Sequence, residues 1–254
     1  MLNFNDPTPF EVINENGKAP LLIACDHAEN RIPECLFGLG MDKAHMEKHI
    51  AYDIGAKQVS IMLSRMFDAP LICSGYSRLV IDLNRHLDDH SLVTPHSDNI
   101  DVPGNQNLSA EELKLRIDCF FHPYHDQYAR MAKRVVADHD QPLILSVHSF
   151  TPSINGILRP WEYGVLWDDP HRKLSQMVID NFRKIDGLTI GDNQPYHARD
   201  PMGYAQVEHA EKNGMEMALI EIRQDLILDE QRQMQAAEIM YQVISPLIAQ
   251  GASK

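Results

Sequence analysis

Two histidines each follow a run of apolar residues, in positions where they could bind one metal ion. His27 comes after the run PLLIAC, and His148 comes after the run PLILSV. Neutral imidazole is the commonest zinc ligand, and two imidazoles with one oxygen ligand leave a coordination position open. Water in that position has a pKa of about 7 and is a nucleophile at neutral pH. The alternative is that each histidine is only a polar cap, but two at matching positions favour metal binding.

A glutamate in a third apolar run could supply the base for such a site. Glu221 lies in the segment MALIEI. Burial raises the pKa of a carboxylate, and a nearby dication lowers it. A carboxylate balanced in this way suits a general base that takes a proton from water and passes it to a leaving nitrogen. The alternative is an ion pair with Arg223, which lies two residues away on the same face of a strand.

Two arginines are candidates for contacts with a substrate. Asn84 and Arg85 follow the run LVIDL, and a guanidinium group binds a carboxylate through two parallel hydrogen bonds. Arg78, on the same segment, could polarise a scissile carbonyl and stabilise the developing oxyanion. Either arginine could instead form an ion pair with Asp82 or Asp53.

Two long polar segments, residues 86–107 and 191–203, are predicted to be loops. Long loops inside a domain are often functional, and some close over a site. The second loop and the residues after it contain further polar candidates, namely His197, Arg199, Tyr204 and His209. His209 is a catalytic candidate that would donate to the substrate or to a tetrahedral intermediate, with a solvated helical histidine as the equal alternative. Tyr204 and Arg223 are candidate substrate-binding residues.

Predicted strands alternate with predicted helices, a pattern typical of an α/β fold with a mostly parallel sheet and helices on both faces. In such sheets ligands bind beyond the carboxyl ends of the strands, so the polar residues above are expected to meet at one edge. Strands are expected at residues 20–25, 70–73, 79–83, 142–147, 163–167 and 217–222. Helices are expected at about residues 42–66, 109–138, 170–185, 204–213 and 229–250, with a capping box in Ser109 and Glu112.

Composition limits the class of protein. The 254 residues, 44% of them hydrophobic, are expected to form a single α/β domain over 1–254 with a loose lead-in at 1–18. The net charge of −13 argues against nucleic acid and anionic membranes as partners. The four cysteines form no CxxC pair, and the N-terminus does not resemble a signal peptide. We therefore expect a cytoplasmic protein without a membrane span, and its oligomeric state stays open.

The chain resembles the N-formylglutamate amidohydrolase family, in the branch usually labelled predicted. The resemblance covers about residues 18–228 and depends on the segments CDHAENRIP, AYDIGA, SRLVIDLNR, FFHPYH, LSVHSFTP, GDNQPY and IEIRQDL, in this order. The family is similar in its site plan to zinc carboxypeptidases. The resemblance implies a three-layer αβα, zinc-carboxypeptidase-like fold of the phosphorylase/hydrolase type and zinc or another divalent metal as cofactor. It also implies hydrolysis of an N-acyl amino acid, above all N-formyl-L-glutamate.

The resemblance also implies roles for individual residues. His27 and His148 would be metal ligands, Asn84 and Arg85 would anchor a substrate carboxylate, and Glu221 would be the general base.

One position departs from the related site plan. That plan has a glutamate three residues after its first histidine, where this chain has Asn30, with Glu29 one residue earlier. An amide oxygen is a weaker zinc ligand than a carboxylate. The third ligand is therefore open between Glu29, Asn30, a water molecule and a distant carboxylate such as Asp53.

Two other functions compete with hydrolysis of a small N-acyl amino acid. One is a carboxypeptidase or amidase acting on peptides or cell-wall fragments, which needs an open groove, whereas the two long loops favour a small closed site. The other is a metal- or acid-binding protein without turnover, which the missing glutamate of the site plan would allow.

Overall fold

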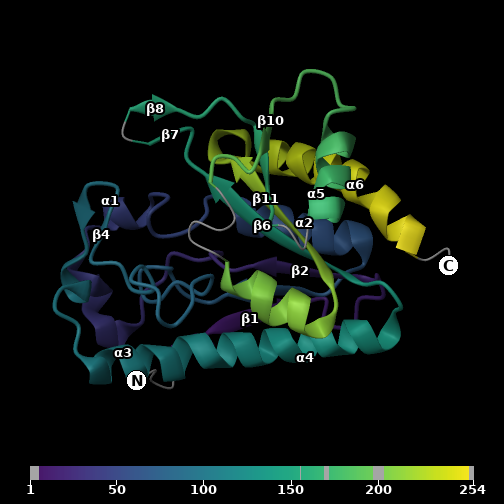
Figure 1. Ribbon diagram of the computed structural model, residues 1–254. Coiled ribbons are helices and arrows are strands. Elements are labelled where there is room, and N and C mark those ends of the chain that lie inside the picture. Colours follow the sequence, from purple (N-terminus) through teal and green to yellow (C-terminus); the bar gives the residue numbers. More distant parts are fainter. Residues whose placement is uncertain (1–5, 155, 169–171, 197–202, 252–254) are drawn as a thin grey trace.

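A seven-stranded sheet forms the centre of the molecule (Figure 1). The computed structural model describes residues 6–154, 156–168, 172–196 and 203–251. The strands lie in the order β1 (Phe10–Ile13), β3 (Leu71–Ser74), β2 (Leu21–Cys25), β6 (Leu143–Phe150), β11 (Glu216–Arg223), β9 (Tyr163–Leu166) and β10 (Ile190–Asp192). The four central strands β3, β2, β6 and β11 are parallel, so their carboxyl ends lie at the same edge.

The outer strands are mixed in direction. Strand β1 pairs antiparallel with β3, β9 pairs antiparallel with β11, and β10 pairs parallel with β9. Two small hairpins lie outside the sheet, β4–β5 (His96–Ser97 and Ile100–Asp101) and β7–β8 (Ser153–Ile154 and Ile157–Leu158). The predicted mostly parallel α/β fold is confirmed.

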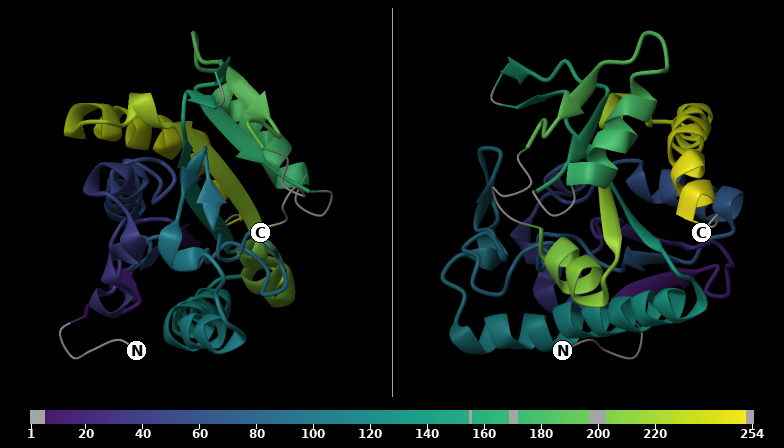
Figure 2. Two further views of the ribbon diagram at one scale, coloured as in Figure 1. Left: turned by 90° about the vertical axis from the view of Figure 1, so that its left-hand side faces the viewer. Right: turned by 45° about the vertical axis from the view of Figure 1, so that its right-hand side comes forward.

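Helices cover both faces of the sheet (Figure 2). One face packs against α2 (Ala56–Phe67), α5 (Arg172–Phe182) and α6 (Glu230–Gly251), and the other packs against α4 (His122–Asp138) and the π-helical turn η5 (Gln206–Ala210). The remaining helical segments are short: η1 (Glu34–Gly40), α1 (Lys43–Met46), η2 (Pro103–Asn105), α3 (Ala110–Arg116), η3 (Ile117–Phe121), η6 (Glu211–Asn213) and η7 (Gln224–Leu226). Within the described residues, none of the helices combines the length and apolar character that a membrane span requires.

The apolar run of β2 explains how one strand serves two layers. Ile23 and its alternate neighbours join the core under α2, whereas Leu22 and Ala24 join the core under α4. All five residues of β2 are buried, as expected for a strand covered on both faces. Packing in the two cores therefore fixes the position of the carboxyl end of β2, where the polar residues begin.

Five predicted segments differ from the structure. Two of them are the loops expected at 86–107 and 191–203, which contain the hairpin β4–β5 and the last two residues of β10, respectively. The helix expected at 42–66 is two helices, α1 and α2, separated by a loop. The strand expected at 79–83 is a chain of turns, in which the Val80 amide donates to the Ser77 carbonyl, and its apolar side chains fill the core without a strand partner. The lead-in expected at 1–18 contains β1. In contrast, the capping box at Ser109 is present, with the Glu112 amide donating to the Ser109 hydroxyl.

Candidate metal centre and active site

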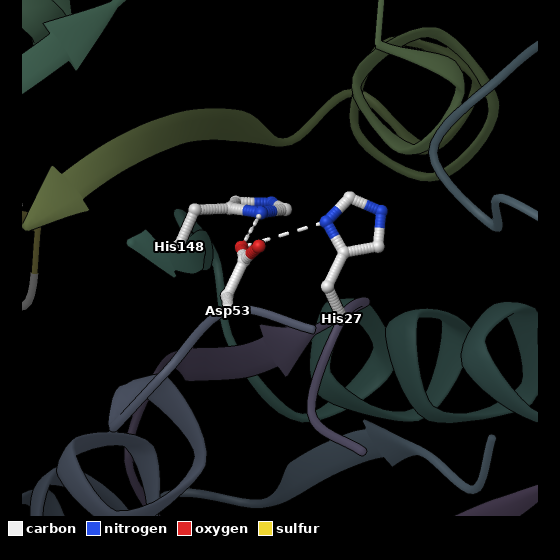
Figure 3. Close-up of side chains that lie close together, drawn as sticks. All are labelled: His27, Asp53 and His148. Atoms are coloured by element: carbon white, nitrogen blue, oxygen red, sulfur yellow. Dashed lines mark hydrogen bonds and ion pairs between the residues drawn. The ribbon is translucent and has the colours of Figure 1, made fainter. Parts of the chain in front are cut away.

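Three buried side chains from separate segments meet at the carboxyl edge of the sheet (Figure 3). Nδ1 of His148 lies 2.8 Å from Oδ2 of Asp53, and Nδ1 of His27 lies 3.4 Å from the same oxygen. One ligand atom from each residue lies within 4.8 Å of the other two. Each side chain is at most 5% exposed. Two imidazoles and a carboxylate at this spacing form a donor set that suits zinc or a similar divalent cation.

The far nitrogen of each imidazole is bound by another polar side chain. Nε2 of His27 lies 2.8 Å from Oδ1 of Asp82, and Nε2 of His148 lies 3.0 Å from the Ser146 hydroxyl. A bond on one ring nitrogen fixes the tautomer and leaves the other nitrogen free as a ligand. Nδ1 of His27 has no hydrogen-bond partner among the described residues, although it is buried. The arrangement therefore fits a cation between the two Nδ1 atoms and Asp53.

Asp26 extends this network behind His148. Its Oδ2 atom lies 3.6 Å from Nε2 of His148, and its Oδ1 atom accepts a hydrogen bond of 2.5 Å from the Tyr124 hydroxyl. Asp26 is 1% exposed. Burial acts to raise its pKa, but the nearby His148 and the hydrogen bond from Tyr124 lower it overall, so the carboxylate is kept ionised.

Local backbone structure explains how Asp53 reaches the histidines. Asp53 lies in the loop between α1 and α2, and its amide donates to the His27 carbonyl at 2.9 Å. Gly55, the residue before α2, has φ of +80°, and a Cβ there would lie 2.3 Å from the Ile227 carbonyl oxygen. Only glycine fits at this turn, which places the carboxylate beside the ends of β2 and β6.

The ionisable side chains in and around the cluster shift one another's pKa values. Burial acts to raise the pKa of Asp53 and that of Asp82, but neighbouring side chains outweigh burial and lower both pKa values overall. The largest lowering influence comes from His27 for Asp53 and from Arg78 for Asp82. Burial acts to lower the pKa of His148, but the carboxylates of Asp26 and Asp53 raise it overall. Arg78 donates to Oδ2 of Asp82 at 2.5 Å and lies 3.6 Å from Oδ1 of Asp53.

Glu221 lies beside the metal cluster on the neighbouring strand. In the β6–β11 ladder it is the direct partner of His148. It is 7% exposed, and its Oε2 atom has no hydrogen-bond partner in the part of the chain that the structure describes. Burial raises the pKa of its carboxyl to about 7. An unpartnered carboxylate with this pKa is suited to proton transfer at neutral pH.

A cavity of about 290 Å³ opens over the cluster. Its wall includes all three cluster residues, Glu221 and Arg78. The segment 84–98, which contains hairpin strand β4, also lines the cavity, through Asn84, Arg85, Ser91, Thr94, Ser97 and Asp98. Further lining residues are His49, Phe150, Thr151 and Tyr196. The volume suits a small molecule.

The predicted substrate anchors Asn84 and Arg85 both line this cavity. Arg85 donates to the Ser91 hydroxyl at 3.2 Å and to the Asn84 carbonyl at 2.8 Å. Oδ1 of Asn84 accepts from the Ala205 amide at 3.3 Å. Their roles in substrate binding stay predictions.

Three other candidates lie away from the cavity wall. His209 is 1% exposed and lies 2.9 Å from His125 among aromatic rings. Tyr204 packs its ring against Phe121 and His125, and the Arg223 guanidinium is bound by Asp225. The cavity wall as described contains none of the three, because their polar groups face other partners. Two more candidates, His197 and Arg199 from the predicted loop at 191–203, lie outside the described residues.

The structure gives Glu29 and Asn30 other partners than a metal ion. Oε1 of Glu29 lies 2.6 Å from Nζ of Lys57, and the Asn30 amide donates to the Met46 carbonyl at 2.9 Å. Neither belongs to the cluster, in which Asp53 supplies the carboxylate. Of the four alternatives open from sequence, the distant carboxylate is the one that the geometry favours.

Sequence reasoning gave no role to Asp26, Ser146 and Tyr124. A usable signal existed for the first two, since Asp26 precedes His27 and Ser146 lies two residues before His148 on the same face of its strand. Tyr124 gave no such signal, because its contact with Asp26 spans 98 residues of sequence.

The chain is similar in sequence and in fold to known proteins. The family model for N-formylglutamate amidohydrolase matches residues 19–228. The crystal structure of the gene product Atu2144 from Agrobacterium tumefaciens is 31% identical, with a TM-score of 0.91 over 97% of this chain and 98% of that chain. The N-formylglutamate amidohydrolase from Ralstonia eutropha JMP134 is 16% identical and has the same fold, with a TM-score of 0.69 over 97% of this chain and 99% of that chain. No curated protein matches the sequence significantly.

Proposed function

The chain belongs to the N-formylglutamate amidohydrolase family, and from this premise we propose that it hydrolyses the amide bond of an N-acyl amino acid. N-formyl-L-glutamate or a related acidic compound is the proposed substrate. The observation that carries the proposal is the buried Glu221 carboxylate, whose Oε2 atom has no hydrogen-bond partner among the described residues. It lies beside the cluster of His27, Asp53 and His148, in a cavity of small-molecule size.

The cluster of His27, Asp53 and His148 would hold zinc or another divalent cation. When bound, such a cation polarises a carbonyl group and lowers the pKa of water to about 7. Asp82 and Ser146 orient the imidazoles through their Nε2 atoms, at 2.8 and 3.0 Å. Contacts of this kind would orient each imidazole so that its Nδ1 atom could serve as a ligand when a cation is bound.

Glu221 is the proposed general base. Its Oε2 atom takes a proton from the attacking water while the water oxygen bonds to the acyl carbon. The carbon–nitrogen bond then breaks, and Glu221 returns the proton to the leaving nitrogen. The products are a carboxylic acid, formate for a formyl group, and the free amino acid.

Arg78 and the pair Asn84–Arg85 are proposed to hold the substrate. The Arg78 side chain is 25% exposed at the cavity wall, and its cation is secured by Asp82 and Asp53, which raise its pKa further against the lowering effect of burial. It is placed to stabilise negative charge that develops on the carbonyl oxygen. Arg85, whose hydrogen bonds within the described residues go to the neutral Ser91 hydroxyl and Asn84 carbonyl, is proposed to bind the substrate α-carboxylate.

A peptidase or amidase acting on large fragments is the second candidate. The cavity volume of about 290 Å³ favours a small substrate over an extended peptide. We also propose that the protein works in a reducing, cytoplasmic environment, which its four free cysteines support.

A substrate screen with purified protein tests the proposal. N-formyl and N-acetyl derivatives of glutamate, glutamine, aspartate and leucine are incubated with the protein, and the free amine released is measured together with bound metal. We expect turnover of the acidic N-formyl compounds, loss of turnover with a chelator, and recovery with added zinc. Rates equal to the uncatalysed reaction for every compound, with metal bound, would overturn the proposal.

A further inference from the structure

His49 lines the cavity from the same loop that supplies the Asp53 carboxylate. It lies after α1 and four residues before Asp53, and both side chains belong to the cavity wall. The His49 side chain is 22% exposed, whereas those of the cluster residues His27 and His148 are 3% and 4% exposed. Its imidazole is therefore a part of the wall that a bound molecule can reach, and it does not belong to the proposed metal cluster.

Asp98 contacts one nitrogen of this imidazole. Its Oδ2 atom lies 3.4 Å from Nε2 of His49, and Asp98 also lines the cavity. Asp98 and Asn99 form the two-residue turn between β4 and β5, with φ of +45° and +60°. Two positive φ values are typical of the tight type I′ turn of hairpins, which Asp and Asn tolerate. The hairpin turn therefore holds the Asp98 carboxylate against the loop that follows α1 (Figure 1).

The surroundings of His49 determine its charge and its tautomer. Burial is the largest influence on the pKa of His49 and lowers it below its usual value, and Arg159 and Arg78 lower it further. Asp98 and Asp53 act to raise this pKa but do not reverse the shift. The ring is therefore uncharged at neutral pH. A carboxylate oxygen beside Nε2 favours the tautomer with the proton on Nε2, which leaves Nδ1 as a hydrogen-bond acceptor.

The polar groups of the proposed substrate need different partners in the cavity wall. An N-acyl derivative of an acidic amino acid has one hydrogen-bond donor at neutral pH, its amide N–H, and its other polar groups are oxygen acceptors. Arg78 and Arg85 suit those oxygens. The carboxylates of Asp53 and Asp82 are engaged by the histidine cluster and by Arg78, and Glu221 must stay free for water in the proposed reaction. An N–H buried without an acceptor is costly, so the wall should supply a neutral one.

We propose that His49 is a substrate-binding residue whose Nδ1 atom accepts the amide N–H of the N-acyl amino acid, with Asp98 as its positioning residue. The inference rests on the proposed function and narrows its substrate class to amides that carry a hydrogen on nitrogen. An ester, in which oxygen replaces the N–H group, would place a lone pair against Nδ1. His49 therefore acts for the amide and against the ester, and discrimination between them measures its role.

The test compares N-formyl-L-glutamate with 2-formyloxyglutarate, its ester counterpart, which differs only in having oxygen in place of N–H. Both are titrated calorimetrically into the zinc-loaded Glu221→Gln protein, which lacks the proposed base, and into the same protein carrying His49→Gln. We expect the amide to bind at least about tenfold more tightly than the ester when His49 is present, and at most about twofold more tightly with His49→Gln.

Asparagine and glutamine at this position separate the two contacts of the imidazole. The amide oxygen of asparagine, like Nδ1, is attached at Cγ, so His49→Asn should keep the preference for the amide to within about threefold. Glutamine can still reach Asp98 but has no acceptor attached at Cγ. His96→Gln is the control on the same hairpin, because His96 is 54% exposed and lies 2.9 Å from Asp101. It should bind both compounds as the parent protein does.

Asp98→Asn tests the positioning role and keeps the test decisive if a His49 variant does not fold. Asparagine tolerates the left-handed turn, but the negative charge beside Nε2 is lost. We expect the preference for the amide to fall about threefold and the ¹⁵N NMR spectrum of the His49 ring to show partial protonation of Nδ1. Asp101→Asn is the matched control and should leave that spectrum unchanged. A wild-type spectrum in Asp98→Asn would contradict the positioning role.

Hydrolysis assays on the wild type separate this inference from the proposed function. Selective binding of the amide that His49→Gln abolishes, without hydrolysis by the wild type, would refute the proposed reaction and support the role of His49. Hydrolysis by the wild type, with the same preference for the amide whether or not His49 is replaced by glutamine, would overturn the role of His49 alone. Failure of both compounds to bind would overturn both.

Discussion

Nδ1 of His148 lies 2.8 Å from Oδ2 of Asp53, although 95 residues of sequence separate them. The two side chains reach each other from a central strand and from the loop before α2. Asp53 is also tied to the other histidine, because its backbone amide donates to the His27 carbonyl. These two contacts hold the Asp53 carboxylate beside both imidazoles. The proposed metal site therefore depends on a loop conformation as much as on the ends of the strands.

The first prediction concerns Asp53 as a metal ligand. Asp53→Asn replaces a carboxylate by an amide, a weaker zinc ligand of nearly the same size. We expect zinc affinity to fall by at least about 100-fold and the metal content of the purified protein to fall well below that of wild type. Metal analysis and competition with a chromogenic chelator measure both quantities.

Glu29→Gln is the matched control for this prediction. Glu29 is the carboxylate nearest to His27 in sequence after Asp26, but it is bound by Lys57 and Arg31. The variant should keep wild-type zinc affinity. If Glu29→Gln lost the metal and Asp53→Asn retained it, the ligand set proposed from the structure would be wrong.

The sequence was informative where function depends on regular structure. The ends of β2, β6 and β11 could be placed from their apolar runs, so His27, His148 and Glu221 could be predicted to lie at one edge of a parallel sheet. The family resemblance is confirmed by the match to residues 19–228. Strand ends are predictable because burial on both faces leaves a continuous apolar pattern.

The loops were not predictable in the same way. The pattern at 42–66 predicts one helix because its apolar spacing is helical, yet the chain leaves the helix between α1 and α2 and turns at Gly55. The turn depends on contacts with the His27 carbonyl and with Ile227, which are distant in sequence. A periodicity argument contains no information on contacts of this kind.

The second prediction separates catalysis from metal binding. Glu221→Gln removes the carboxylate that can accept a proton but keeps the shape of the side chain. We expect kcat to fall about 10²- to 10⁴-fold, the usual contribution of a general base, with zinc content unchanged. Steady-state kinetics and metal analysis on the same preparation measure the two effects.

Glu216→Gln, at an exposed position of the same strand, is the control and should have wild-type kcat. A Glu221→Gln enzyme that turns over at the wild-type rate would exclude Glu221 as the base. Loss of zinc from that variant would show instead that the Glu221 carboxylate contributes to zinc binding.

The third prediction tests the hydrogen bond behind His148. Tyr124→Phe removes the donor to Oδ1 of Asp26, which leaves that buried carboxylate less well compensated. We expect the free energy of unfolding to fall by about 1–3 kcal/mol and zinc affinity to fall about tenfold. Chemical unfolding and zinc titration measure the two changes.

Tyr128 offers a matched control on the same helix. It is also fully buried, but its hydroxyl has no hydrogen-bond partner among the described residues. Tyr128→Phe should therefore leave zinc affinity unchanged and should not lower the free energy of unfolding. Similar losses of zinc affinity in both variants would mean that aromatic packing, not the bond to Asp26, is responsible.

The fourth prediction concerns stability at acid pH and the buried pair His125–His209. Burial lowers the pKa of His125 to about 3, helped by the neighbouring His209, and burial lowers that of His209 to about 4. The unfolded chain, with a histidine pKa of about 6.5, binds protons that the folded pair excludes. Stability from this pair is therefore present above pH 6.5 and is lost as the pH falls toward 4.

The loss amounts to about 2 kcal/mol per histidine between pH 7 and pH 5, because each is protonated only in the unfolded state over that interval. His148 has the opposite sign, since its pKa is raised in the fold. The measurement is thus a difference between variants: His209→Gln should lose less stability than wild type between pH 7 and pH 5 in urea unfolding. His90→Gln, at a side chain that is 97% exposed, should follow wild type. Identical pH dependence in wild type and His209→Gln would contradict a folded state that keeps His209 neutral.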